Sequence, residues 1–196
     1  MDSSGNVYAT GSTYSPTFSN GQEDAVVFMF DSTATFKYGR FWGSTLIEVG
    51  TGIALDSSEA YFYICGYSNS VGTLSIAEYD VFVIKWAAAT GLVQWAQRFG
   101  YNYNDFAYGI YEFSGSVYVT GYSDSTGWAG ANNKTDILLL KIYTASATTE
   151  YGKFIGGSQE DSGIKIIVDT DGSIYTLGQG LSVELTFGTQ DVFLIK

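Results

Sequence analysis

The sequence predicts an all-β protein built from one repeated antiparallel sheet, and three observations carry this prediction. Aromatic residues make up 17% of the chain and charged residues only 15%, a balance typical of short strands joined by many turns. Short segments recur at a fixed spacing along all 196 residues. Each period holds four short apolar or alternating runs, and no helical pattern competes with them.

Three independent series of segments mark the repeat. A segment ending in glycine, as in GNVYATG, recurs at Gly11, Gly66, Gly121 and Gly178. A segment that begins with aspartate recurs at Asp24, Asp80, Asp136 and Asp191. A third segment, as in WAQRFG, ends at Gly43, Gly100 and Gly156. The series share one period of about 56 residues, which indicates a tandem repeat.

The four runs of each period predict four antiparallel strands. In the first complete period these strands are 38–42, 50–55, 61–66 and 80–86. The turns 2–5 and 169–172 begin with Asp and end with Gly, which suits the positive φ of a hairpin turn. Four-stranded units of this size are typical of β-propeller blades.

The predicted fold is therefore a β-propeller of about three and a half four-stranded blades. A half blade covers residues 1–36, and blades cover 37–92, 93–148 and 149–196. Because about fourteen strands are too few for an ordinary closed ring, we expect the chain to be part of a larger ring and a fragment of a longer protein.

At these segments the chain resembles the bacterial-type β-propeller repeat family, often called the seven-bladed propeller repeat. The family pattern ends in Gly-Asn-Val-Tyr-Val-Thr-Gly and Asp-Ala-Phe-Val, and residues 2–11 and 24–27 follow it closely, as do 115–121 and 166–178. The Gly pair is complete only at 156–157, and the family's tryptophan is present only as Trp95. The resemblance implies a scaffold or binding platform in a large secreted or surface protein, without a defined activity.

Composition excludes several function classes. The formal charge of −11 would repel nucleic acid, and no apolar run is long enough for a membrane span. The chain contains no histidine, which excludes histidine-dependent nucleophilic triads. The single cysteine, Cys65, forms no internal disulfide and is expected to be a small apolar strand residue.

Most acidic residues recur with the repeat, which favours a structural role over catalysis. An active site occurs once, whereas a carboxylate present in every blade is expected to cap turn N–H groups or to tie strands together. Two series of repeated acids are Asp24, Asp80, Asp136 and Asp191, and Glu48, Asp105 and Asp161. A third series is Asp2, Asp56 and Asp169, with Glu112 nearly in register. We therefore predict no catalytic residue and no metal ligand.

Two alternatives stay open for the acids. Calcium is one, because Asp169-Thr170-Asp171-Gly172 alternates hard oxygen ligands, although the rest of an EF-hand loop is missing. A carboxylate-based enzyme is the other, and it would need two unrepeated acids beside a pocket. The unrepeated acids considered for this are Glu78, Asp124, Glu150 and Glu184.

Aromatic residues suggest a second functional hypothesis, which is ligand binding. The repeated ones, which include Tyr38 with Trp95 and Tyr8 with Tyr63, are expected to pack between blades. Trp128 has no repeat counterpart and is the candidate ligand contact, and Asn133 of Asn-Lys-Thr is a possible glycosylation site.

We therefore expect a non-enzymatic structural or protein-interaction module of an extracellular or cell-surface protein. Its partner would be another protein or other blades of the same parent chain. The alternatives are a carbohydrate-binding module that uses loop aromatics to bind a glycan, and a catalytic propeller with an unrecognised carboxylate site.

Overall fold

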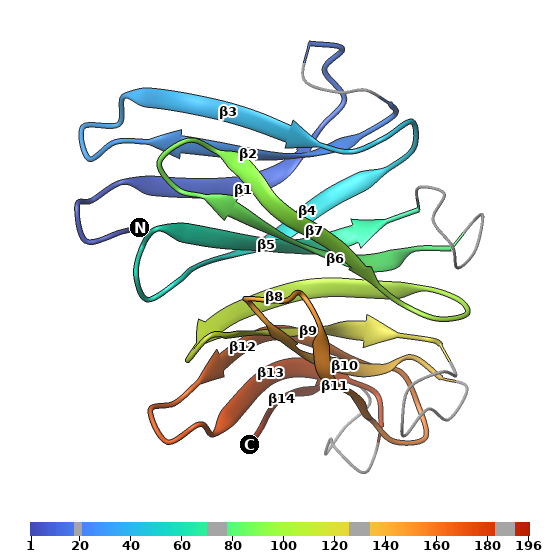
Figure 1. Ribbon diagram of the computed structural model, residues 1–196. Coiled ribbons are helices and arrows are strands. Elements are labelled where there is room, and N and C mark those ends of the chain that lie inside the picture. The colour runs from blue at the N-terminus through green and yellow to red at the C-terminus, as the bar shows by residue number, and fades with distance from the viewer. Residues whose placement is uncertain (18–20, 70–77, 126–133, 183–190) are drawn as a thin grey trace.

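The computed structural model describes residues 1–17, 21–69, 78–125, 134–182 and 191–196 (Figure 1). Within these ranges the protein contains fourteen strands and no helix, and hence no helix that could cross a membrane. The strands are β1 (Val7–Thr13), β2 (Asp24–Phe30), β3 (Phe36–Trp42), β4 (Glu48–Leu55), β5 (Tyr61–Ser68), β6 (Asp80–Ala87), β7 (Leu92–Phe99), β8 (Asp105–Phe113), β9 (Ser116–Ser123), β10 (Asp136–Tyr143), β11 (Thr149–Ile155), β12 (Asp161–Val168), β13 (Ile174–Gly180) and β14 (Asp191–Ile195).

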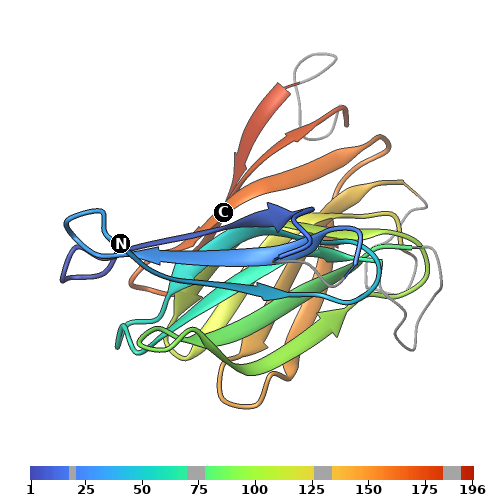
Figure 2. The ribbon, with the colours of Figure 1, turned by 90° about the horizontal axis from the view of Figure 1, so that it is seen from above.

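The strands form four antiparallel sheets that follow chain order. The sheets are β1-β2-β3, β4-β5-β6-β7, β8-β9-β10-β11 and β12-β13-β14. They are stacked from the first sheet at one end to the last at the other, and each is turned relative to the one before (Figures 1 and 2). The predicted all-β fold of propeller blades is confirmed, and we number these sheets as the first to fourth blade.

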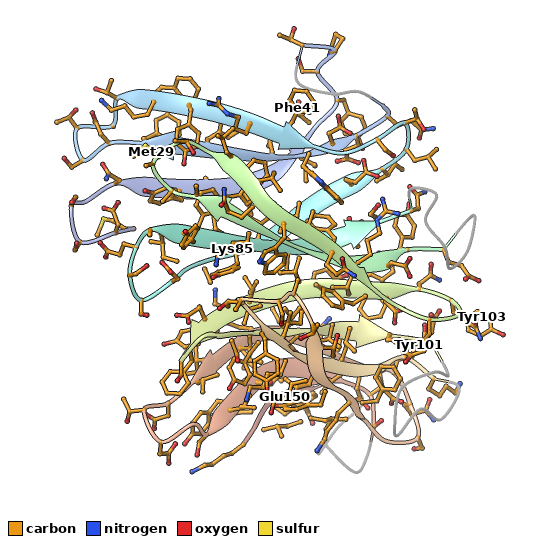
Figure 3. The ribbon with its side chains drawn as sticks, in the orientation of Figure 1. Met29, Phe41, Lys85, Tyr101, Tyr103 and Glu150 are labelled. Carbon is orange, nitrogen blue, oxygen red and sulfur yellow. The ribbon has the colours of Figure 1, made fainter. Side chains whose placement is uncertain are left out.

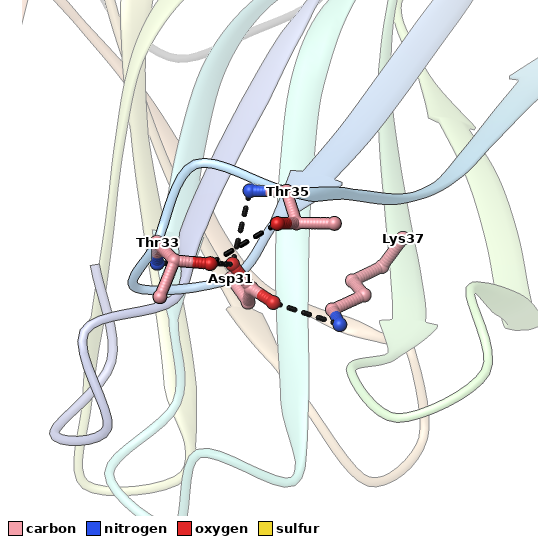
Figure 4. A network of polar contacts seen from close by, with 4 residues as sticks. All are labelled: Asp31, Thr33, Thr35 and Lys37. Atoms are coloured by element: carbon pink, nitrogen blue, oxygen red, sulfur yellow. Dashed lines mark hydrogen bonds and ion pairs between the residues drawn. The ribbon is translucent and has the colours of Figure 1, made fainter.

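The predicted blade boundaries were wrong by one strand. The blade predicted over 37–92 joined β3 to β4, whereas β3 pairs with β2 in the first blade. The cause is the tight turn 31–35, in which the Asp31 carboxylate accepts hydrogen bonds from the backbone N–H of Thr33 and Thr35 and pairs with Lys37 at 2.7 Å (Figure 4). This turn makes β2 and β3 a hairpin, and β6 pairs with β7 and β10 with β11 in the same way. The strand that was predicted to open the blades over 37–92, 93–148 and 149–196 therefore closes the preceding blade.

The first strands of the second, third and fourth blades carry the same irregularity. The register shifts at 50/52 in β4, 107/109 in β8 and 163/165 in β12, as expected for a β-bulge. The expected positive φ is present at Gly5 and Gly172. The corresponding turn of the second blade, 56–60, has no glycine, and there Glu59 adopts the positive φ, at 57°.

Each blade has a forward face toward the following blade and a backward face toward the preceding one. Successive residues of a strand point to opposite faces, so Val81 and Val83 of β6 lie forward and Phe82 and Ile84 lie backward. An apolar cluster fills each of the three spaces between blades. The first contains Ala25, Val27, Phe62, Ile64, Phe82, Ile84 and Trp86; the second Tyr63, Cys65, Val81, Val83, Val117, Val119, Leu138, Leu140 and Ile142; the third Tyr118, Leu139, Ile166 and Val168.

Candidate functional site

The repeated acids meet where one blade passes into the next. The four strands of a blade are counted as in the second blade, from β4 (first) to β7 (fourth), so that β1, β2 and β3 are the second, third and fourth strands of the first blade. At each junction the backbone N–H of the acid that opens a first strand (β4, β8 or β12) donates to the carbonyl of the residue before the aspartate that opens the third strand of the preceding blade (β2, β6 or β10). The three such bonds are Glu48 to Glu23 (2.7 Å), Asp105 to Tyr79 (2.6 Å) and Asp161 to Thr135 (2.7 Å). Each bond therefore brings one acid from each of two series to the same blade junction.

The first-strand acids cap the connection that leads into their own strand. Each accepts a hydrogen bond from the backbone N–H four residues earlier, from Ser44 to Glu48, Tyr101 to Asp105 and Gly157 to Asp161. Each also accepts from a serine hydroxyl at or after the end of the second strand, from Ser68, Ser125 and Ser182 respectively. These carboxylates thus accept hydrogen bonds from the backbone N–H groups of the connection and tie it to the second strand of the sheet.

The third-strand acids lie on the other side of the same junction. Asp24, Asp80 and Asp136 are buried, and Asp191 is partly buried. A Cβ atom added at Gly100 would overlap the Asp80 carboxylate and lie 2.9 Å from Oδ2 of Asp105. Glycine at this place therefore leaves the room in which the two carboxylates approach each other.

Burial changes the titration of these acids. Desolvation raises the pKa of Asp105 to about 6, because a buried carboxylate loses the solvation of its charge. Desolvation also raises the pKa of Glu48, with nearby Asp24 adding to the effect, and that of Asp80, where the Arg98 charge opposes it.

The turn acids form local caps. Asp2 accepts from the backbone N–H of Ser4 and Asn6, Asp56 from that of Tyr61, and Asp169 from that of Thr170. Asp171, the second acid of the calcium alternative, accepts from the Ser173 N–H. No group of three or more acids or cysteines that could hold a metal ion occurs among the residues that the structure describes, and calcium stays an alternative.

The unrepeated acids are also engaged in local structure. Glu78 accepts from the Tyr103 N–H, and Asp124 accepts from the Asn104 N–H. Glu150, labelled in Figure 3, pairs with Lys141 at 2.8 Å. Glu184, Trp128 and Asn133 lie outside the described residues.

A row of half-buried aromatic rings leads to a cavity between the third and fourth blades. Tyr67, Phe106 and Tyr122 follow one another at ring-centre distances of 4.7 and 4.8 Å, and Tyr108 lies 5.8 Å from Tyr122. The cavity has a volume of about 300 Å³ and is also lined by Glu160 and Gln179. The repeat pattern did not predict this row, although Tyr108 and Tyr122 are both present in the sequence.

A larger cavity of about 730 Å³ lies along the first strands of three blades. Its walls come from β4, β8 and β12, and they include Ile53, Ile110 and Ile166. The acids that line it, Asp56 and Glu112, belong to the repeated turn series.

The repeated aromatic residues make two kinds of contact, one between blades and one within a blade. The fourth-strand aromatics reach the next blade: the Tyr38 hydroxyl donates to the Ala88 carbonyl and Trp95 Nε1 to the Thr144 carbonyl. On the forward faces a lysine lies over a tyrosine ring, as Lys85 does over Tyr63 at 5.7 Å. Lys141 over Tyr118 and Lys196 over Tyr175, both at 5.4 Å, repeat this contact.

Comparison with known proteins gives a weak structural match and no match in sequence. No model of a known protein family matches the chain, and no curated protein matches it. Among solved structures, it is similar to one described as the crystal structure of an ACO/RPE65 chimera, with a TM-score of 0.45 and 10% sequence identity. The match covers 87% of this chain and 43% of that chain, so this chain spans less than half of that protein.

Proposed function

We propose that the chain is a non-enzymatic β-propeller scaffold that binds protein in an extracellular or cell-surface protein. The observation that carries this proposal is the use of the repeated carboxylates at blade junctions and in hairpin turns. Neither cavity described above is lined by two unrepeated acids, which an acid–base hydrolase would need.

Membership of the bacterial-type propeller repeat family belongs to the same proposal and is supported by the recurring segments at 5–11 and 115–121. The expected partners of the chain are another protein or further blades of a parent chain. The charge of −11 is consistent with the exclusion of nucleic acid.

An activity screen tests the non-enzymatic part. The purified chain would be assayed with chromogenic glycosides and esters, beside Glu160→Gln, since Glu160 is the unrepeated acid at the smaller cavity. We expect no turnover above a buffer blank from either protein. Turnover by the wild type that Glu160→Gln abolishes would contradict the proposal.

Carbohydrate binding is a second candidate, favoured by the aromatic row beside the smaller cavity. Tyrosine rings stack on the apolar faces of sugars, and Gln179 and Glu160 could hydrogen-bond sugar hydroxyls there. A glycan-array signal that Tyr108→Ala removes would support this candidate, and an empty array would argue against it.

A further inference from the structure

The connection between the second and third blades presents two exposed tyrosines. Tyr101 is 44% exposed and Tyr103 51%, and both lie at the end of the molecule where each blade passes into the next, which we call the junction end (Figure 3). Serine and leucine take their places in the connection 43–47, and glycine and glutamine in the connection 156–160. Because the other two connections have no aromatic residue at these places, the repeated scaffold does not account for the pair.

Hydrogen bonds hold the backbone that carries the two tyrosines. The Tyr103 N–H donates to the Glu78 carboxylate at 2.8 Å. Both the backbone N–H and the side-chain amide of Asn104 donate to the Asp124 carboxylate. The tyrosines are thus fixed on the surface beside two partly exposed acids, and a ligand that binds them would not have to order this connection first.

The cavity between the third and fourth blades continues this surface. Tyr122, two residues before Asp124, is one of the side chains that line it. In the third blade Phe106 lies opposite Tyr122 across the paired strands, whereas Ser162 and Gln179 hold the equivalent places in the fourth blade. These two smaller side chains leave the cavity of about 300 Å³ beside Tyr122.

Acidic side chains predominate at the junction end. The acids that open the first and third strands lie there, and so does the exposed Glu160, which lines the cavity. Arg98 and Lys134 also lie at this end, whereas lysines such as Lys85 and Lys141 lie near the hairpin turns at the opposite end. The surface around the tyrosines is therefore negatively charged and would attract a cationic partner.

One lysine of the chain shows how such a surface binds a cation. Lys141 Nζ lies 5.4 Å from the centre of the Tyr118 ring and 2.8 Å from the Glu150 carboxylate. A tyrosine ring with a carboxylate beside it thus holds an ammonium group in this protein. Within the described residues no lysine or arginine lies over the ring of Tyr103 or Tyr122, so the same combination at the junction end is available to a cation from another molecule.

We propose that the junction surface, formed by Tyr101, Tyr103, Glu78, Asp124 and the cavity beside Tyr122, binds a lysine- or arginine-rich segment of a partner protein. This inference rests on the proposed scaffold function, because it names the kind of protein that the scaffold binds. Cationic side chains would lie over the tyrosine rings, with the carboxylates as their counter-ions. A neutral sugar would stack on the same rings but would gain nothing from the surplus of acids.

Fluorescence anisotropy of labelled peptides with the full chain tests the proposal. The probe is a fluorescein-labelled decapeptide of alternating lysine and glycine, and two comparison peptides replace its lysines by glutamate or by serine. Unlabelled cellohexaose is added as a competitor, because it presents a neutral sugar. We expect the lysine peptide alone to bind, with an affinity that falls as the salt concentration is raised, and we expect cellohexaose not to displace it.

Two variants of the junction surface and two matched controls locate the binding. Tyr103→Asn introduces a residue that tolerates the φ of 76°, and Glu78→Gln keeps an oxygen that can accept from the Tyr103 N–H. The controls are Tyr143→Asn, at a tyrosine that is 44% exposed near a hairpin turn, and Glu150→Gln, which removes the same charge there. Circular dichroism would show that each variant is folded, and Glu160→Gln, at an exposed side chain, replaces a variant that is not.

Tyr103→Asn and Glu78→Gln should each raise the Kd for the lysine peptide about fivefold. The two controls should change it by less than about twofold, because their only effect is on the net charge. Three results would overturn the proposal. They are no binding of the lysine peptide at low salt, equal losses in the junction-surface variants and the controls, and binding of cellohexaose in place of the peptide.

Failure of this inference and failure of the scaffold function are distinguishable. An absence of peptide binding would leave a blank turnover screen unchanged. Turnover by the wild type would contradict the scaffold function whether or not the peptide binds.

Discussion

Asp105 is fully buried at the junction of the second and third blades, where desolvation raises its pKa to about 6. An aspartate in an unfolded chain titrates near 3.9, about two units lower. Between these values the folded protein holds a proton that the unfolded chain has released. The free energy of unfolding must therefore fall as pH rises through this window.

We predict that the protein is more stable at pH 5 than at pH 7.5. For Asp105 alone the loss across the window is on the order of 2 kcal/mol, and Glu48 and Asp80 act in the same direction. Asp31, whose pKa is lowered by Lys37, acts in the opposite direction, but only at the acidic end of the range. Urea denaturation at a series of pH values measures the effect.

Asp105→Asn is the matched variant for this prediction. The amide oxygen can still accept from the Tyr101 N–H and the Ser125 hydroxyl, while the titrating charge is gone. Its stability should depend less on pH than that of the wild type. Identical pH profiles for the two proteins would show that Asp105 is not the responsible group.

Gly100 permits the close approach of two carboxylates, which leads to a second prediction. A methyl group there would overlap the Asp80 carboxylate, so Gly100→Ala should lower the free energy of unfolding by about 2 kcal/mol. Gly11→Ala is the control, because a Cβ at Gly11 meets no atom within 4 Å. Equal chemical-denaturation midpoints for the two variants would contradict this account.

At the scale of elements, the repeat made the strands predictable but not their grouping. Four runs per period indicate four strands wherever the period is cut, and the predicted units were cut one strand early. The information lay in the short connections: residues 31–35 and 88–91 are tight turns, with Gly91 at φ 64°. Reading the threonine and glycine at 90–91 as a hairpin signal would have placed β7 beside β6.

The aromatic contacts between neighbouring blades give a third prediction. Tyr38→Phe removes the hydroxyl that donates to the Ala88 carbonyl in a buried place, so it should lower the free energy of unfolding by about 1 kcal/mol. Tyr103→Phe, at a tyrosine that is largely exposed, should change it very little. Parallel urea titrations compare the two, and a larger loss for Tyr103→Phe would refute the proposed contribution of the blade contact.

At the scale of the whole molecule, the repeated acids were predictable as a class, whereas their pairing at blade junctions was not. Periodicity identifies equivalent positions, such as Asp24 and Asp80, but it carries no information on which two series meet in space. The meeting depends on how consecutive sheets are stacked, and that depends on the strand grouping. The aromatic row was missed for the same reason, since Tyr67 and Phe106 belong to different blades.

The packing of neighbouring blades against each face of a blade leads to a fourth prediction, for hydrogen exchange. The second and third blades are covered on both faces, so amides of β5, β6, β9 and β10 should exchange last. Amides of β1 and β14, in the blades with one open face, should exchange first. Exchange monitored by mass spectrometry at a concentration where the protein is monomeric checks the order, and protection of β14 equal to that of β6 would be inconsistent with it.

The raised pKa of Asp105 also has a consequence for the heat of unfolding. Near pH 5 the folded protein releases hydrogen ions when it unfolds, and the buffer takes them up with its own heat of ionisation. The calorimetric enthalpy measured in acetate and in a buffer with a large ionisation heat would therefore differ at that pH. This enthalpy difference, divided by the difference between the ionisation heats of the two buffers, gives the number of protons that are released on unfolding.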